Sequence, residues 1–240
     1  MKTCLVGCGG IAAVHGSVLT SGIDTEFVAA ADIKLEKAQS YAENFHTKPY
    51  PSLESMLEAE KPDVLHICTP HYLHVPMAIY SLERNINVFM EKPPAISFDQ
   101  LEELKKAAAK SDAQLGFCYQ NRYNASIRAA KDLIDSGKSG KVLGARAFVT
   151  WCRGAAYYTE SGWRGSLKTE GGGVLINQSV HTQDLLCFLL GDPTAVDATM
   201  TNHHLKDVIE VEDTLNPILT LTASMQASMR RPPTAQMSHR

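Results

Sequence analysis

The sequence lacks the features that mark membrane, secreted and nucleic-acid-binding proteins. No apolar run among its 240 residues approaches the roughly 18–20 residues needed to span a bilayer. The first residues run straight into a strand-like segment, without the longer apolar stretch and small-residue cleavage site of a secretory signal. Lys and Arg number 23 against 26 Asp and Glu, so there is no surplus of positive charge for a phosphate backbone. We therefore expect a cytoplasmic protein with no membrane or nucleic-acid partner.

The cysteines are few and scattered. They are Cys4, Cys8, Cys68, Cys118, Cys152 and Cys187. Metal-binding cysteines usually come in pairs about two to four residues apart, and only Cys4 and Cys8 approach that spacing. Cys8, however, lies in a glycine-rich turn, while Cys4, Cys68 and Cys118 lie in apolar segments typical of buried strands. We expect buried free thiols in a reducing compartment and no metal site.

Strand-like and helix-like segments alternate through the first half of the sequence. Short apolar runs predict strands at Thr3–Val6, Phe27–Ala31, Val64–Cys68, Asn87–Met90 and Gln114–Tyr119. Helical spacing of apolar residues predicts helices at Ile11–Leu19, Leu35–Phe45, Ser52–Glu60, Pro76–Arg84 and Phe98–Lys110. This alternation favours an α/β fold in which helices cover both faces of a parallel sheet. Ligands of such sheets bind outside the carboxyl ends of the strands.

A glycine-rich turn follows the first strand. Residues Gly7–Ala12 fit the G-x-G-x-x-G/A pattern of dinucleotide-binding Rossmann domains. In that pattern Gly7 permits the tight turn, Gly9 lets the backbone approach a pyrophosphate, and Ala12 permits close packing of helix and strand. Amide groups at the start of the next helix would face the phosphates. The expected cofactor contacts here are Gly7, Gly9, Gly10, Ile11 and Ala12.

An acidic residue, Asp32, directly follows the second predicted strand. A carboxylate at this position accepts hydrogen bonds from the ribose hydroxyls of NAD and repels the 2′-phosphate of NADP. Lys34 lies close by in the sequence and would weaken that repulsion. Together with the glycine turn, Asp32 predicts an NAD site, with NADP as the less favoured cofactor.

Five further stretches give the chain a resemblance to a known family. They occur in the order Val64–Pro70, Asn87–Pro93, Tyr119–Tyr123, Gly162–Gly165 and Gly171–Asn177, the last followed by His181. On these motifs the chain resembles the Gfo/Idh/MocA oxidoreductases, the family of glucose–fructose oxidoreductase and inositol 2-dehydrogenase. The resemblance extends from residue 3 to about residue 222. It implies an NAD(P)-dependent dehydrogenase with a Rossmann domain and a second, substrate-binding domain.

The charged pair Glu91 and Lys92 ends an apolar strand, which would place both charges at the ligand edge of the sheet. Pro93 restricts Lys92 to an extended backbone and adopts a cis bond more readily than other residues. Beside a cationic nicotinamide, the pKa of such a lysine would fall toward a range useful for proton transfer. A salt bridge at a strand end is the alternative reading of this pair.

Asn177 and His181 are four residues apart on a helix predicted over Gly171–Leu190, so they would share one face. An amide and an imidazole on one stripe suggest a polar site against the nicotinamide, and a hydrogen-bonded core histidine is the alternative. In the family the position of Asn177 is often aspartate, and an amide cannot take up a proton. The resemblance therefore implies Lys92 and His181 as the acid–base candidates and Asn177 as an orienting group.

The resemblance also implies further contacts. Cofactor contacts are expected at Thr69, Pro70, His74, Glu91, Lys92 and Arg122. Substrate contacts are expected at Lys92, Trp163, Arg164, Asn177 and His181. His71 and His74 lack an evident third metal ligand, so packing and cofactor contact are favoured over a metal site. An arginine and an indole suit ribose, phosphate or sugar contacts, although either side chain could pack a domain interface.

The second half predicts an α+β domain. Helices are expected at Ser126–Asp135 and Gly171–Leu190, strands at Lys141–Cys152, Ala195–His203 and Ile218–Ala223, and a loop over the site at 154–170. We expect a Rossmann domain at 1–121, a substrate domain with an open, mostly antiparallel sheet at 122–228, and a disordered tail at 229–240. The family's sheet normally continues further. We therefore expect a shortened domain whose incomplete sheet favours a homo-oligomer.

These features predict reversible hydride transfer between a nicotinamide and a secondary alcohol of a sugar, sugar derivative or cyclitol. Several polar groups near the cofactor suit a polyol better than an apolar ketone. One alternative is a redox-neutral lyase or glycosidase of the same family that uses NAD transiently. The other is a catalytically inactive NAD-binding protein, which the shortened second domain suggests and the presence of both Lys92 and His181 disfavours.

Overall fold

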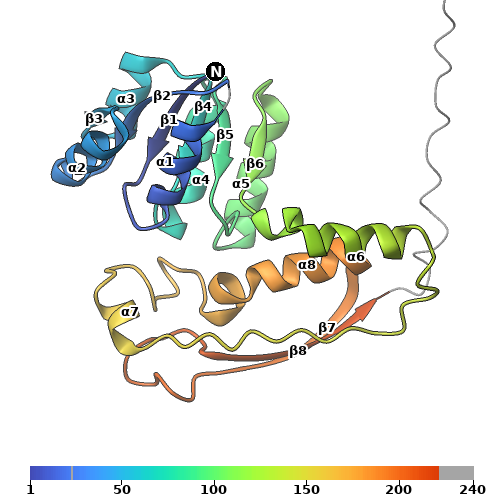
Figure 1. Cartoon of the computed structure of the whole chain (residues 1–240). Helices are drawn as coiled ribbons and strands as arrows, with labels where there is room; N and C mark the ends of the chain where they lie inside the picture. Colours follow the sequence, from blue (N-terminus) through green and yellow to red (C-terminus); the bar gives the residue numbers. More distant parts are fainter. Residues whose placement is uncertain (23, 222–240) are drawn as a thin grey trace, which may run out of the picture.

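The computed structural model describes residues 1–22 and 24–221, which form a parallel-sheet domain and a smaller α+β domain (Figure 1). Six strands make one sheet in the order β3-β2-β1-β4-β5-β6, with every neighbouring pair parallel. The strands are β1 (Lys2–Val6), β2 (Glu26–Ala31), β3 (Lys48–Tyr50), β4 (Val64–Ile67), β5 (Asn87–Met90) and β6 (Leu115–Phe117). This is the strand order of a dinucleotide-binding Rossmann sheet. The predicted α/β class is confirmed.

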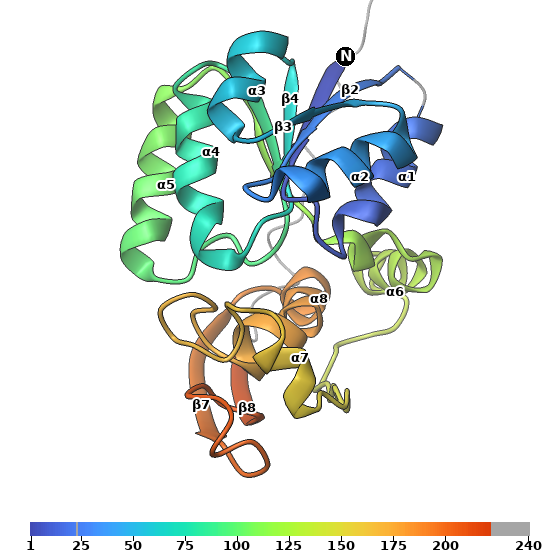
Figure 2. The ribbon, with the colours of Figure 1, turned by 90° about the vertical axis from the view of Figure 1, so that its left-hand side faces the viewer.

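Helices cover both faces of this sheet, as Figure 2 shows. They are α1 (Ala12–Ser21), α2 (Leu35–Phe45), α3 (Leu53–Glu60), α4 (His74–Leu82) and α5 (Phe98–Lys110). The larger apolar cluster packs α3, α4 and α5 against one face through residues such as Met56, Val75 and Leu104. A smaller cluster, which includes Ala12 and Tyr41, packs α1 and α2 against the other face. Burial on both faces explains why the strands are short, nearly continuous apolar runs.

The carboxyl ends of the strands point toward the second domain (Figure 2). The sequence predicted every strand of this sheet except β3, which is only three residues long and contains Pro49. A run so short, with a residue that cannot donate to the ladder, has no recognisable alternation. Predicted helix and strand ends otherwise differ from the observed ones by one or two residues.

The second domain places helices over a two-stranded antiparallel sheet. Its helices are α6 (Ala125–Asp135), α7 (Ala155–Thr159) and α8 (Val180–Leu190), and its strands are β7 (Pro193–Thr201) and β8 (Thr214–Leu221). A short 3₁₀ turn at Gln120–Tyr123 connects the two domains, where the sequence predicted a boundary. The loop expected at 154–170 contains α7, which is only five residues long.

The strand predicted at Lys141–Cys152 is wrong. Residues 140–154 form an extended segment between α6 and α7 without strand structure (Figure 1). Among the described residues, β7 pairs only with β8, and neither strand pairs with this segment. Alternating side chains specify an extended backbone, but a strand also needs a hydrogen-bonding neighbour, and none is paired with it here.

The continuous helix predicted over Gly171–Leu190 is interrupted. Residues Val174–Gln178 form a π-helical turn, and α8 begins only at Val180. Glu212, from the loop before β8, accepts hydrogen bonds from the backbone N–H groups of Gly173 at 3.0 Å and Leu175 at 2.8 Å. A carboxylate at the start of a helical segment satisfies free N–H groups and the positive end of the dipole. No local sequence signal announces a capping group from so distant a residue.

The tail predicted for residues 229–240 lies outside the described residues, as does the end of the strand predicted at Ile218–Ala223. Within residues 1–22 and 24–221, no helix combines the length and apolar character required to cross a membrane.

One buried carboxylate holds the amino-terminal edge of the sheet domain together. Glu60, 5% exposed at the end of α3, accepts hydrogen bonds from Tyr50 at 2.6 Å and Lys48 at 2.9 Å and forms an ion pair with Lys2 at 2.9 Å. The hydrogen bonds from Tyr50, Lys48 and Lys2 lower the pKa of Glu60 to about 2. The charge of Glu60 is therefore compensated in the folded chain.

We predict that Glu60→Gln lowers the free energy of unfolding at pH 7 by about 2 kcal/mol, because charge-assisted hydrogen bonds are lost. The folded-state pKa is depressed, so this contribution is complete above the ordinary glutamate pKa of 4.5 and disappears as the pH falls toward 2. Urea denaturation at several pH values measures both effects, with exposed Glu58→Gln as the control. Equal stability of Glu60→Gln and the parent at pH 7 contradicts this assignment.

Candidate active site at the carboxyl edge of the parallel sheet

The glycine turn between β1 and α1 has the geometry that a dinucleotide requires. Gly7 has a φ of +92°, and a Cβ there would lie 2.8 Å from the backbone of Cys68. Only glycine satisfies both conditions. At Gly9 and Gly10, by contrast, a Cβ would meet nothing within 4 Å, so the outer side of the turn is open. Backbone amides there can approach a pyrophosphate, as expected from the sequence.

Asp32 follows β2 and lies against the glycine turn. One carboxylate oxygen accepts a hydrogen bond from the backbone N–H of Cys8 at 2.9 Å, and the other accepts one from that of Lys34 at 2.9 Å. These two contacts hold the carboxylate at the edge of the sheet beside the turn. The structure thus brings together the two sequence elements that predicted the cofactor site.

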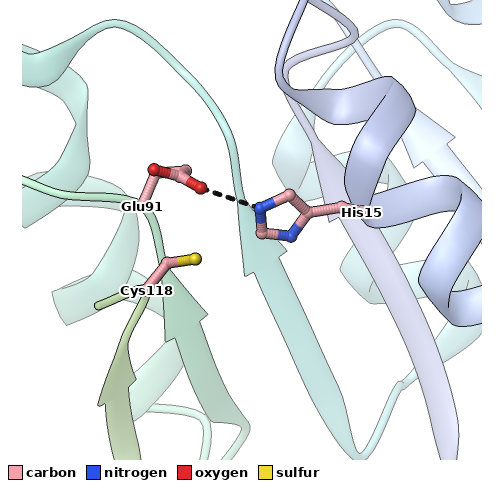
Figure 3. A group of neighbouring side chains, drawn as sticks. All are labelled: His15, Glu91 and Cys118. Carbon is pink, nitrogen blue, oxygen red and sulfur yellow. Dashed lines mark hydrogen bonds and ion pairs between the residues drawn. The ribbon is translucent and has the colours of Figure 1, made fainter. Parts of the chain in front are cut away.

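Glu91 is held from below by α1. Figure 3 shows His15 of α1, Glu91 after β5 and Cys118 after β6 converging on one point, with His15 Nε2 2.9 Å from Glu91 Oε1. His15 Nδ1 lies 2.9 Å from Nδ1 of His66. Burial opposes ionisation of Glu91, but the hydrogen bond and charge of His15 outweigh it, and the pKa of Glu91 is lowered. Glu91 is therefore a buried, compensated anion beside Lys92.

The same three residues place three potential metal-ligand atoms within 4.8 Å of one another. However, the His15–Glu91 hydrogen bond already uses two of those atoms. Burial raises the pKa of the Cys118 thiol to about 12, with the charge of Glu91 adding to the effect. A neutral thiol beside a hydrogen-bonded pair is accounted for by protein contacts alone.

Lys92 reaches across to the second domain. Its Nζ donates hydrogen bonds to Asn177 Oδ1 at 3.0 Å and to the Asn177 carbonyl oxygen at 3.3 Å. The amide of Asn177 then donates to Glu170 Oε1 at 2.6 Å and to the Tyr157 hydroxyl at 3.3 Å. Lys92, Asn177 and Glu170 thus form one hydrogen-bonded chain, and the predicted meeting of Lys92 and Asn177 is observed.

Glu170 is the charged end of this chain and has no exposed surface. Its second oxygen accepts a hydrogen bond from the Gly165 N–H at 2.5 Å. Burial raises the pKa of Glu170, while the donors on its two oxygens oppose that rise. Because both neighbours are N–H donors, the ionised carboxylate is the form that fits this environment. A carboxylate therefore supports the side of Asn177 that faces away from Lys92.

The pKa of Lys92 is lowered, chiefly by burial. Glu91 and Glu170 oppose the change, and the nearby positive charge of Arg164 adds to it. Partial loss of the ammonium proton is what a general base at this position needs. The lowered pKa that the sequence predicted is present, and it arises within the protein itself.

His181 lies on α8 near the same point. Burial lowers its pKa, and the charge of Lys92 lowers it further, so the neutral imidazole is favoured. Its Nδ1 is buried without a hydrogen-bond partner among the described residues, and its ring lies 6.1 Å from that of Tyr119, centroid to centroid. A neutral imidazole with an unused ring nitrogen can hold or accept a hydroxyl proton.

The loop after β4 is held by two histidines. His74 has no exposed surface, and its ring nitrogens lie 2.8 Å from the Pro93 carbonyl oxygen and 3.0 Å from that of Thr69. This supports the predicted packing role and leaves no surface of His74 for direct cofactor contact. Nδ1 of His71 lies 2.9 Å from the carbonyl oxygen of Glu170. The hydroxyl oxygen of Thr69 is buried without a partner among the described residues, which leaves it available to a ligand.

The other predicted contact residues lie at the junction of the two domains. Arg122 forms a bidentate pair with Asp184 of α8, including one hydrogen bond of 2.8 Å, and so ties the 3₁₀ turn to α8. Trp163 packs on His71 with ring centroids 4.7 Å apart. Arg164 lies over the rings of Tyr157 and Trp163. The structure therefore assigns Arg122 and Trp163 interface contacts, and their ligand contacts stay predictions.

Sequence reasoning passed over three residues of this site: His15, Tyr157 and Glu170. Glu170 stands directly before three glycines, and an acidic residue beside such a turn was the available signal. His15 lies one helical turn after Ile11, so only the helix register could have suggested its position. Tyr157 belongs to a segment without periodicity, where no signal existed.

Comparisons with known proteins agree with this geometry. Residues 1–119 match the family model described as oxidoreductase family, NAD-binding Rossmann fold, and residues 127–237 match the GFO/IDH/MocA C-terminal domain. D-Glucoside 3-dehydrogenase of Escherichia coli (strain K12) is 29% identical over 197 residues, which cover 80% of this chain and 55% of that protein. The chain spans about half the length of the curated relatives it matches.

Two solved structures are similar over most of the chain. The WlbA dehydrogenase from Chromobacterium violaceum gives a TM-score of 0.87 at 31% identity and covers 93% of this chain and 64% of its own. The Bordetella pertussis WlbA dehydrogenase gives 0.84 at 30% identity, with coverage of 92% and 67%. Both were determined in complex with NADH and UDP-GlcNAcA.

We predict that Lys92 titrates below the ordinary lysine value of 10.5 and that Glu170→Gln lowers its pKa further, because a negative charge near the ammonium is removed. The pH dependence of Lys92 acetylation, followed by mass spectrometry of its peptide, measures the titration. Glu103→Gln, on the exposed face of α5, is the control and should change nothing. A Lys92 midpoint at 10.5 or above, or one that does not respond to Glu170→Gln, contradicts the proposed chain of interactions.

Proposed function

The chain belongs to the Gfo/Idh/MocA oxidoreductase family, and we propose that it transfers hydride between NAD and a secondary alcohol of a sugar, sugar derivative or cyclitol. The observation that carries this proposal is the meeting of Lys92, Asn177 and His181 at the carboxyl edge of a dinucleotide-binding sheet. A proton acceptor with a lowered pKa at this edge is what alcohol oxidation needs. The NADH and UDP-GlcNAcA bound to the WlbA relatives support a sugar substrate.

Residues of the first domain would hold the cofactor. The open backbone at Gly9 and Gly10 suits the pyrophosphate, and the Asp32 carboxylate suits the ribose hydroxyls of NAD. The partnerless Thr69 hydroxyl lies at the same edge, after β4. When bound, NAD supplies the nicotinamide carbon that takes up or releases hydride.

The protein's own groups would manage the hydroxyl proton. Lys92 Nζ is positioned by Asn177, and its lowered pKa makes the neutral amine accessible, so it can accept the proton at Nζ. His181, neutral and with Nδ1 unused, can hold the same hydroxyl or take the proton instead. Asn177 can only orient, since an amide does not transfer protons at neutral pH.

The proposal extends to the setting of the protein. All six cysteines are free thiols, which suits the cytoplasm. Val196 and Met200 on β7 and Ile218 on β8 are more than half exposed, which supports association of copies through this sheet.

We predict that the chain binds NAD more tightly than NADP and that Asp32→Ser narrows the difference. The serine loses the ribose hydrogen bonds, weakening NAD by roughly tenfold, and removes the repulsion of the 2′-phosphate. Asp32→Asn is the matched variant, because it retains an oxygen for the Cys8 N–H but lacks the charge. Calorimetric titration with both cofactors measures this, and equal or tighter NADP binding by the parent refutes it.

We predict that Lys92→Met and His181→Ala each reduce turnover by roughly 10²–10⁴-fold while NAD affinity stays within a few-fold. The cofactor-binding turn and Asp32 lie on other loops, so they should not be affected. Asn177→Ala should cost less, and Lys106→Met on exposed α5 should cost nothing. NADH absorbance with a panel of polyols and sugars gives the rate.

Two outcomes of this experiment would change the proposal. Substrate conversion without net NADH formation would identify a redox-neutral reaction. NAD binding by the parent without conversion of any polyol would identify an inactive NAD-binding protein. Retention of near-parent turnover in His181→Ala would leave Lys92 as the sole proton acceptor.

A further inference from the structure

Two arginine side chains pack on the ring of Tyr157 beside the site. The Cζ atom of Arg164 lies 4.3 Å from the Tyr157 ring centroid and 4.6 Å from that of Trp163. The Cζ atom of Arg153 lies 5.1 Å from the same Tyr157 ring and 5.3 Å from that of Trp151. Aromatic faces thus hold both guanidinium groups by cation–π contacts.

These guanidinium groups are poorly satisfied. Neither Arg153 nor Arg164 forms a salt bridge among the described residues. The Nε atoms of both are buried without a hydrogen-bond partner in that part of the chain. Arg153 donates one hydrogen bond, to the carbonyl oxygen of Cys152 at 3.0 Å. A guanidinium has five N–H donors, and leaving buried donors unpaired costs free energy.

Arg164 lies next to the proposed catalytic groups. Its charge lowers the pKa of both Lys92 and His71, and the Tyr157 ring beneath it carries the hydroxyl that accepts from Asn177 at 3.3 Å. The charge of Arg164 also acts on Glu170, but both oxygens of that carboxylate already accept hydrogen bonds from Gly165 and Asn177. A positive group with free donors therefore faces the site beside Lys92.

We propose that Arg164, assisted by Arg153, binds an anionic oxyacid group of the substrate, either a carboxylate or a phosphate. This inference rests on the proposed function, because it assigns the substrate class of the same site. A planar guanidinium matches both groups through paired N–H donors. A neutral sugar would leave the charge of Arg164 uncompensated, so the substrate is an acidic sugar or a sugar phosphate.

The two tryptophans make the site directly observable. The chain has only Trp151 and Trp163, and each packs on one of these arginines. Tryptophan fluorescence and calorimetry, with the full chain saturated with NAD, can follow titration by glucose, glucuronate, glucose 6-phosphate and inorganic phosphate. We expect glucuronate or glucose 6-phosphate to bind roughly 10- to 100-fold more tightly than glucose. The tighter of the two identifies carboxylate or phosphate as the group.

Variants separate this role from a structural one. Arg164→Gln should abolish the preference for the anionic sugar, Arg164→Lys should retain part of it, and Arg128→Gln, an exposed arginine of α6, should retain all of it. Unchanged NAD affinity in each variant verifies the fold. Equal affinity of the parent for glucose and its anionic analogues, no binding of any anion, or an unchanged preference in Arg164→Gln overturns the proposal.

Failure of this inference is distinguishable from failure of the proposed function. If the parent oxidises neutral sugars with NADH formation but shows no preference for anions, the dehydrogenase function stands and the anion site falls. If anionic sugars bind through Arg164 without any NADH formation, the anion site stands and the dehydrogenase function falls.

Discussion

The hydrogen bond from Lys92 to Asn177 is the interaction on which the site depends, because it joins the two domains at the point where ligands of a parallel sheet bind. Lys92 comes from the end of β5 and Asn177 from the π-helical turn before α8. Neither domain alone presents an amine, an amide and an imidazole together. The relative position of the two domains therefore determines whether the site exists at all.

This arrangement is possible because each charge near Lys92 has its own support. On the sheet side, Glu91 is held by His15, and on the other side Glu170 is held by Asn177 and the Gly165 N–H. A buried charge without such partners would cost several kcal/mol. Two supported carboxylates keep the amine of Lys92 near the balance between its protonation states, while burial lowers its pKa. The polar network is thus part of the chemistry as well as of the packing.

The segment 154–170 connects this network to substrate recognition. It supplies Tyr157, Arg164 and Glu170, so the group that supports Asn177 and the group that we assign to the substrate anion move together. The contact of His71 with the Glu170 carbonyl oxygen fixes this segment to the loop after β4. Substrate binding and positioning of Lys92 are therefore coupled through a few short contacts rather than through a shared helix.

The sequence by itself determined the Rossmann sheet, the glycine turn and Asp32, because these depend on local rules: apolar runs for buried strands, glycine where φ is positive, and an acid at a strand end. It also singled out Lys92, Asn177 and His181 through ordered motifs. Only the tertiary structure decided that residues 140–154 form no strand, since pairing needs a neighbour. Only it revealed His15, Glu170 and the unpaired guanidinium of Arg164, because burial and hydrogen-bond partners arise when distant segments meet.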